Sequence, residues 1–253
     1  MVEDRIEKLY GTQFLWDEPI EYKDIILYPV KCKDMKIFFS CVNCFLYDPL
    51  RYNLEVSTLP RLYFLTDILN HKEDIEYFTN NKFLYEMFIC FQLLLSLVLG
   101  GKQQFNFVEN NKKWFLRITN SQGKNVDIRA KDFDELRAII LHQNGVDYDD
   151  TFIHEDIRRW IDEQESKENS AYSTIEDYLN AFISITHWKP EDAKELSLRR
   201  FNGIIDKSLS HDTYNSQITA SMSGFATFKG EISHWLISNK KNKIFEKYFK
   251  EVK

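Results

Sequence analysis

The residues best suited to chemistry in this sequence are acidic and precede an expected helix. They form an acidic cluster that consists of Asp147, Asp149, Asp150, His154, Glu155 and Asp156. Oxygen ligands at such short spacing suit Mg²⁺ or Ca²⁺, so a metal-dependent enzyme using Asp147–Asp156 is one hypothesis. However, the ligand spacing of a calcium loop, with its central Gly and terminal Glu, is absent. Because carboxylates also stabilise the N-terminal end of a helix, helix capping is the preferred interpretation and no metal ligand is assigned.

The cysteines give no metal or redox motif. All four lie in the first hundred residues, at Cys32, Cys41, Cys44 and Cys90. Cys41 and Cys44 form a C-x-x-C pair inside an apolar, helix-like segment, but the second pair of ligands that a zinc site needs is missing. We expect buried free thiols, which fits a reducing cytoplasm.

Nucleophilic and nucleotide-binding motifs are also absent. Ser221 and Ser223 follow an amphipathic helical pattern, whereas a nucleophile elbow follows a strand. No P-loop or dinucleotide fingerprint occurs. His187 and His234 each precede a Trp and are interpreted as packing histidines. The sequence therefore predicts a non-enzymatic protein that needs no cofactor.

Charge and hydropathy exclude two further classes of partner. The net charge is −6 with both signs mixed along the chain, whereas nucleic-acid binding needs a basic face. The N-terminus shows no signal-peptide pattern. The apolar run Phe83–Leu99 is interrupted by Glu86 and Gln92, which favours a buried core helix over a membrane span. These features predict a soluble intracellular protein without a nucleic-acid or membrane partner.

Aromatic residues make up 15% of the chain, which is typical of a protein that works through its surface. Tyr, Trp and Phe anchor many protein–protein contacts. Trp188 and Trp235 are candidate contact residues on this basis, and core packing is an equally good interpretation of both.

The elements that would position these residues are clearest between Gln103 and Gly145. Three short alternating runs separated by turn residues predict an antiparallel meander: Gln104–Glu109, Trp114–Thr119 and Val126–Arg129. A helix follows, for which Asp132 and Glu135 predict a capping box. Asn144-Gly145 predicts its end.

The rest of the N-terminal part is expected to pack around this meander. A short helix over 1–10 is followed by an expected hairpin of strands Thr12–Trp16 and Asp24–Val30. Helices are predicted at Met35–Tyr47, Leu62–Asn70 and Phe83–Leu99. Residues 1–145 are therefore predicted to form an α+β domain in which helices cover one face of an antiparallel sheet.

Residues 146–253 are predicted to form a C-terminal helical bundle. The expected helices are His154–Ser166, one capped by Ser173 or Thr174 and running to Ile185, one beginning at Pro190, one through Ile205 and Leu209, and one from an Asp212 cap to Met222. Phe225–Phe228, Ile232–Ile237 and Ile244–Tyr248 would close the chain.

Several segments resemble structural and tail-assembly proteins of bacteriophages that infect low-GC Gram-positive hosts. The resemblance covers Gly11–Lys31, Asp132–Asp150, Ser173–Lys207 and Ser221–Leu236. It includes a Leu-to-Arg-Phe segment, here Leu198–Phe201, followed by a Ser-Gly…His-Trp segment, here Ser223 to Trp235.

The resemblance implies a non-enzymatic chaperone in the host cytoplasm that covers the tape-measure or tail-tube protein during tail assembly. A permanent virion component at the baseplate or neck is the alternative, and homo-oligomerisation stays open. No catalytic residues are carried over. The candidate partner-contact residues are Trp188, Arg200, Phe201 and Trp235.

Overall fold

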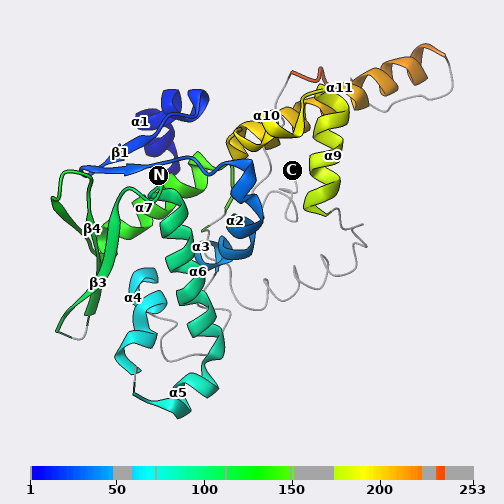
Figure 1. Ribbon diagram of the computed structural model, residues 1–253. Helices are drawn as coiled ribbons and strands as arrows, with labels where there is room; N and C mark the ends of the chain where they lie inside the picture. Colours follow the sequence, from blue (N-terminus) through cyan, green and yellow to red (C-terminus); the bar gives the residue numbers. More distant parts are fainter. Residues whose placement is uncertain are drawn as a thin grey trace, which may run out of the picture. The chain divides into compact units, whose positions relative to one another are not determined.

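The computed structural model describes residues 2–47, 59–71, 73–111, 113–148, 150, 174–223 and 232–236 (Figure 1). Helices and two small antiparallel sheets make up the fold, which confirms the α+β class. The chain forms two compact units: residues 1–147 together with 194–199, and residues 148–193 together with 200–253. The first unit thus includes a short segment from the C-terminal part of the chain. The predicted domains, 1–145 and 146–253, are instead each one continuous stretch of sequence.

The N-terminal helix is longer than expected. Helix α1 spans Val2–Trp16, so the predicted strand Thr12–Trp16 is wrong. Ile6 and Phe14 are almost fully buried, and the Phe14 ring stacks on His142 at 5.9 Å between ring centroids. Two buried residues eight positions apart lie on one face of a helix, and burying them against another helix favours the helical state.

The predicted pairing of Thr12–Trp16 with Asp24–Val30 is wrong, although a shorter hairpin forms within residues 20–27. Strand β1 (Ile20–Tyr22) pairs antiparallel with β2 (Ile25–Leu27). Lys23 and Asp24 form the turn, both with positive φ, as a two-residue hairpin turn requires. The segment 17–19, expected to be that turn, instead connects α1 to β1.

Helix α6 (Lys82–Val98) is the central helix of the first unit, as its apolar sequence predicted. One face is buried through Leu84, Met87, Phe88, Phe91, Leu94, Leu95 and Val98. Helices α2 (Met35–Cys41) and α3 (Asn43–Leu46) pack against it. The Phe91 ring centroid lies 5.9 Å from that of Phe45 in α3 and 5.5 Å from that of Phe133 in α7 (Ala130–Gln143). None of the helices in the described part of the chain has the length and apolar character needed to cross a membrane.

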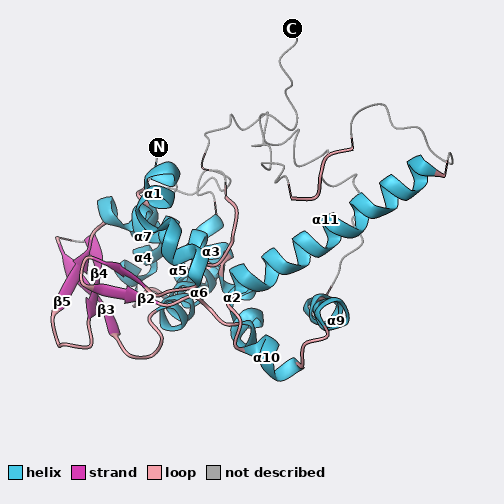
Figure 2. Ribbon diagram, turned by 90° about the horizontal axis from the view of Figure 1, so that it is seen from above, coloured by secondary structure: helices cyan, strands magenta, loops and turns pink. Residues whose placement is uncertain are grey.

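The predicted meander is confirmed. Strands β3 (Gln104–Asn110), β4 (Lys113–Thr119) and β5 (Asn125–Ile128) form an antiparallel sheet in that order. Leu116, Ile118 and Ile128 are fully buried. Helix α4 (Arg61–Thr66) packs on β4, and Phe107 contacts Phe88 of α6 with ring centroids 5.1 Å apart. The helices and the sheet thus share one core (Figure 2).

Helix α7 (Ala130–Gln143) follows the sheet, but the predicted capping box is wrong. The residue at the N-cap is Arg129, and its side chain makes no capping hydrogen bond. Asp132 instead pairs with Lys23 at 2.6 Å, and Glu135 accepts a hydrogen bond from the Tyr22 hydroxyl at 3.0 Å. Burial, followed by the charge of Glu135, raises the pKa of Tyr22, so the hydroxyl stays a donor. The first turn of α7 therefore binds the hairpin instead of capping itself.

Residues 26–30, at the end of β2 and after it, obtain hydrogen-bond partners for their backbone groups from distant parts of the sequence. The Gln103 amide bonds both the N–H and the carbonyl of Ile26. Gln143 donates to the Leu27 carbonyl at 3.0 Å. Asn144 accepts from the Val30 N–H at 2.8 Å. Because buried backbone groups must be paired, these amides hold residues 26–30 in the core.

The segment 194–199 completes this pairing. The Leu198 N–H donates to the Val30 carbonyl at 3.0 Å, and the Cys32 N–H donates to the Leu196 carbonyl at 2.9 Å. Ser197 also donates to Asp17 at 2.7 Å. A six-residue segment that lies far away in the sequence thus acts as a short antiparallel neighbour of residues 30–32.

The described C-terminal helices agree only in part with the prediction. Thr174 caps α9 (Ile175–Thr186) through a capping box with Asp177, and α10 covers Pro190–Lys194. Helix α11 runs without a break from Leu198 to Met222, so the expected new start at Asp212 is wrong. The Ser210 hydroxyl donates to the Asp206 carbonyl one turn earlier at 2.7 Å, a bond that a Ser side chain makes inside a continuous helix. The expected helix His154–Ser166 and the segments after 236 lie outside the described residues.

Gly145 lies at the end of α7, where the backbone of Arg199 packs closely against it. A substitution there therefore tests how tightly the segment 194–199 packs on α7. The φ of Gly145 is +68°, and a Cβ there would lie 3.2 Å from the Arg199 Cα. Gly123 has φ +80° with nothing within 4 Å of such a Cβ. We expect Gly123→Ala to cost about 1 kcal/mol of unfolding free energy from the left-handed backbone alone, and Gly145→Ala to cost about 2 kcal/mol or more. Urea unfolding measures both; equal losses would contradict the close packing on Arg199.

A cross-strand ion pair in the meander predicts a pH dependence. Arg117 lies opposite Asp127 and donates to its two carboxylate oxygens at 2.7 and 2.9 Å. The hydrogen bond from Arg117, then its charge, lowers the pKa of Asp127. The pair therefore stabilises the fold above about pH 4, the ordinary Asp pKa, and loses this effect as the pH falls through the lowered pKa.

We expect Asp127→Asn to cost about 0.5–1 kcal/mol at pH 7 and to cost progressively less below pH 4. Urea unfolding of both proteins between pH 7 and pH 2 measures this difference. A difference that stays constant over this range would show that the ion pair does not act through its charge.

Candidate protein-binding site

Helix α6 carries an apolar stripe on the face opposite its buried side. Tyr85, Ile89 and Leu93 are 45%, 36% and 45% exposed. Residues four positions apart lie above one another on a helix face, so these three side chains form one continuous row, called the α6 stripe here. Single exposed apolar residues are ordinary on a protein surface, whereas a row on one helix marks a candidate contact surface.

The last turn of α2 packs beside α6. Cys90 of α6 donates to the Ser40 carbonyl at 3.8 Å, and the two helices contact each other in the first unit. Ile37 of α2, 46% exposed, lies one turn before Ser40 and is a further exposed apolar side chain.

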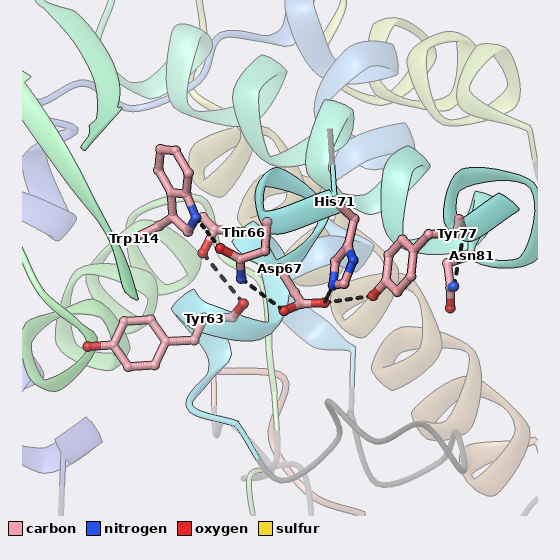
Figure 3. A network of polar contacts seen from close by, with 8 residues as sticks. Tyr63, Thr66, Asp67, His71, Tyr77, Asn81 and Trp114 are labelled. Carbon is pink, nitrogen blue, oxygen red and sulfur yellow. Dashed lines mark hydrogen bonds and ion pairs between the residues drawn. The ribbon is translucent and has the colours of Figure 1, made fainter. Parts of the chain in front are cut away.

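A polar cluster around Asp67 fixes the segment of the chain that precedes α6 (Figure 3). Asp67 is 7% exposed and lies in the short 3₁₀ helix η4 (Asp67–His71). Its carboxylate accepts from the Tyr77 hydroxyl at 2.6 Å and from Asn70 at 3.2 Å. Trp114 of β4 donates to the Asn70 amide oxygen at 2.7 Å. The cluster thus links η4, α5 (Ile75–Asn80) and the meander.

His71 completes the cluster by stacking. Its ring lies 3.7 Å from the Tyr77 ring between centroids, at 9° between planes, and its Nε2 lies 3.8 Å from an Asp67 carboxylate oxygen. An Asp–His pair can serve as a general base, but both oxygens of this carboxylate already accept from Tyr77 and Asn70. The adjoining open hollow is lined by Leu69, Asn70, His71, Glu73, Asp74 and Ile75, a set without a hydroxyl or thiol nucleophile. The arrangement is therefore suited to holding the chain in place.

Helix α5 (Ile75–Asn80) connects the polar cluster to the α6 stripe. The Asp74 side chain caps it by accepting from the Tyr77 N–H at 2.9 Å. Asn81, which joins α5 to α6, donates to the Tyr77 carbonyl at 3.0 Å. The Phe78 ring meets the Tyr85 ring edge-on at 5.7 Å. The cluster therefore fixes where the first residue of the α6 stripe lies.

The contact residues expected from the sequence lie elsewhere. Phe201 is 1% exposed and stacks on Phe182 at 4.8 Å, so as a core residue of the second unit it is not available to a partner. Trp188 is 43% exposed and meets the same Phe182 edge-on, which leaves it a candidate. Trp235 lies against His211 at 5.1 Å. Arg200 and Trp235 are both half-buried.

The sequence contains a signal for the stripe, which the prediction of a buried core helix did not use. Glu86 and Gln92 interrupt the apolar run, and both Lys82 and Glu86 are exposed. The polar positions mark a solvent side, and Tyr85, Ile89 and Leu93 recur on that side at four-residue spacing. An apolar row beside charges is therefore visible in the sequence, although its exposure is a tertiary property.

The acidic cluster lies largely outside the described residues, which include only its members Asp147 and Asp150. Among the described residues, no group of three or more His, Cys, Asp or Glu side chains could hold a metal ion. The cysteines are free thiols, as expected, and Cys32, Cys41 and Cys44 are buried whereas Cys90 is partly exposed.

Comparison with known proteins adds no relative. No family model matches this chain, and neither a curated protein nor a solved structure matches it. The resemblance to phage tail proteins therefore stays a prediction.

The role of the polar cluster can be tested with two Tyr→Phe variants. We expect Tyr77→Phe to lower the unfolding free energy by about 1–2 kcal/mol, because it removes a hydrogen bond to a buried carboxylate. Tyr85→Phe, at an exposed position on the α6 stripe, should change the unfolding free energy by less than about 0.5 kcal/mol. Urea unfolding measures both, and equal values for the two variants would rule out the anchoring role.

Proposed function

We propose that this chain is a non-enzymatic assembly protein whose α6 stripe binds an apolar helical segment of an unassembled phage tail protein. The observation that carries the binding role is the exposure of Tyr85, Ile89 and Leu93 in one row on a helix whose opposite face forms the core.

The surroundings of the stripe support a helical partner. Lys82 and Glu86 form an exposed ion pair at 3.7 Å beside Tyr85, which supplies a polar rim next to an apolar centre. The stripe runs from Tyr85 to Leu93, eight residue steps along the helix, which is about 12 Å at 1.5 Å per residue. That length matches about two turns of an amphipathic helix that presents apolar residues at spacings of three and four.

The assignment to phage tails rests on the resemblance of the sequence segments described above. Under this proposal the chain acts in the host cytoplasm and covers the tape-measure or tail-tube protein until the tail is built. The alternative is a permanent component of the baseplate or neck. Both use a surface that binds other proteins, and they differ in whether the chain remains in the particle.

Quantitative mass spectrometry of purified virions and of the infected-cell lysate separates these two roles. A chaperone is expected in the lysate and not in the particle. A fixed copy number in the particle would identify a structural component instead. If the chain is present in cells but associates with no tail protein in either fraction, the phage assignment is wrong.

The stripe itself is tested by a matched pair of Leu→Asp variants. Leu93 lies in the stripe and is 45% exposed, whereas Leu209 of α11 is 53% exposed outside it. We expect Leu93→Asp to weaken co-purification with the co-expressed tape-measure or tail-tube protein by at least about tenfold, or about 1.4 kcal/mol, because a charge must be desolvated in the contact. Leu209→Asp should bind like the unaltered protein. Equal binding by both variants would exclude the stripe as the binding surface.

A further inference from the structure

Three of the four cysteines lie where α2 and α3 pack on α6. Cys41 of α2 and Cys44 of α3 are buried, at 3% and 4% exposure, and Cys90 of α6 is partly exposed. The Cys90 thiol donates to the carbonyl of Ser40 at 3.8 Å, the residue directly before Cys41. Burial raises the pKa of Cys41, and the neighbouring Cys90 thiol helps to raise it further, as expected for two thiols that lie near each other.

We propose that Cys41 and Cys90 form a peroxide-sensitive thiol pair that closes a disulfide between α2 and α6. A disulfide requires an S–S distance of about 2.0 Å and Cα atoms about 4.4–6.8 Å apart. The Cys90 thiol already contacts the backbone directly before Cys41, and α2 packs on α6, so we infer that the two side chains can turn to bring their sulfurs together. This inference does not depend on the proposed binding function.

The exposure of the thiols sets the order of the two steps. Cys90 is the thiol that a peroxide reaches first, and oxidation is governed by access and thiolate character. The Cys90 sulfur attacks the peroxide, the O–O bond breaks, and Cys90 becomes a sulfenic acid while one water leaves. The Cys41 sulfur then attacks the Cys90 sulfur, the S–O bond breaks, and the thiol proton leaves with the hydroxyl group as a second water. Two thiols lose two electrons, and the peroxide gains them.

The surroundings favour Cys41 as the second partner. Burial, together with the neighbouring Cys90, raises the pKa of Cys41 to about 11, so it stays a thiol at neutral pH and is shielded from the peroxide itself. Cys44 lies on the next helix, and burial raises the pKa of its thiol as well. Cys32 donates to the Ser197 carbonyl at 4.0 Å, away from this group, and serves as the control cysteine.

The bond would connect α2 to α6, the helix that carries the stripe. It would close a loop from residue 41 to residue 90, which includes α4, α5 and Asp67. A covalent link restricts the unfolded chain, so we expect the thermal unfolding midpoint of the oxidised protein to rise and to return after reduction.

The test uses the full-length reduced protein, treated in its folded state with hydrogen peroxide. Remaining thiols are then blocked with an alkylating reagent, and the protein is digested without reductant for mass spectrometry. The expected product is a single internal disulfide that joins the Cys41 and Cys90 peptides, with the loss of two hydrogen atoms. Cys90→Ser should abolish this product, whereas Cys32→Ser should form it at an unchanged rate.

Two results would overturn the proposal. One is a Cys90 sulfenic or sulfinic acid that accumulates while Cys41 remains alkylatable after unfolding. The other is a disulfide that joins Cys90 to Cys44 or to a second molecule. Because these readouts come from the unaltered protein, they hold even if a variant folds poorly. They also leave the binding test of the α6 stripe unaffected.

Discussion

The structure of the first unit depends on the pairing of the backbone between β2 and α2. Residues 26–32 enter the core with only a three-residue strand to pair them, so their remaining N–H and carbonyl groups need partners from elsewhere. Gln103, Gln143 and Asn144 supply amide groups, and Val98 supplies a carbonyl that accepts from the Tyr28 N–H at 2.7 Å. An unpaired buried backbone group costs about as much as a lost hydrogen bond. The ends of α6 and α7 are therefore held in register with this segment.

The same requirement explains why 194–199 belongs to the first unit. Its backbone meets residues 30–32, and its side chains reach α1 and α7. Arg199 lies over the Phe14 ring at 5.2 Å and donates to the His142 carbonyl at 2.6 Å. Without this segment, the outer side of residues 30–32 would lack its antiparallel neighbour. The chain therefore returns to its first unit before α11 continues into the second.

Helix α6 combines a stabilising face and a candidate functional face. Its buried residues tie the helices to the meander, and this leaves the opposite face free to carry Tyr85, Ile89 and Leu93. The polar cluster around Asp67 supports that arrangement, because it fixes the corner that leads into α6 with hydrogen bonds and ring stacking instead of further apolar packing. Cys90, between Ile89 and Phe91 in the sequence, lies at the boundary of the two faces. It is therefore partly exposed, while its thiol contacts the Ser40 carbonyl of α2.

The sequence by itself determined the features that depend on short-range pattern: the meander, the apolar core helix, a cap at Ser173 or Thr174 and the end of α7. Each requires only alternation, helical spacing or the chemistry of a few adjacent residues. Tertiary structure decided the rest. Residues 12–16 form helix and not strand because Phe14 is buried against α7. Asp132 and Glu135 bind the hairpin and do not cap α7. Phe201 became core because Phe182 covers it, and the α6 stripe is exposed because the opposite face of the helix is the one that packs in the core. These outcomes depend on residues brought together from distant parts of the chain, and their contact energies outweigh local preference.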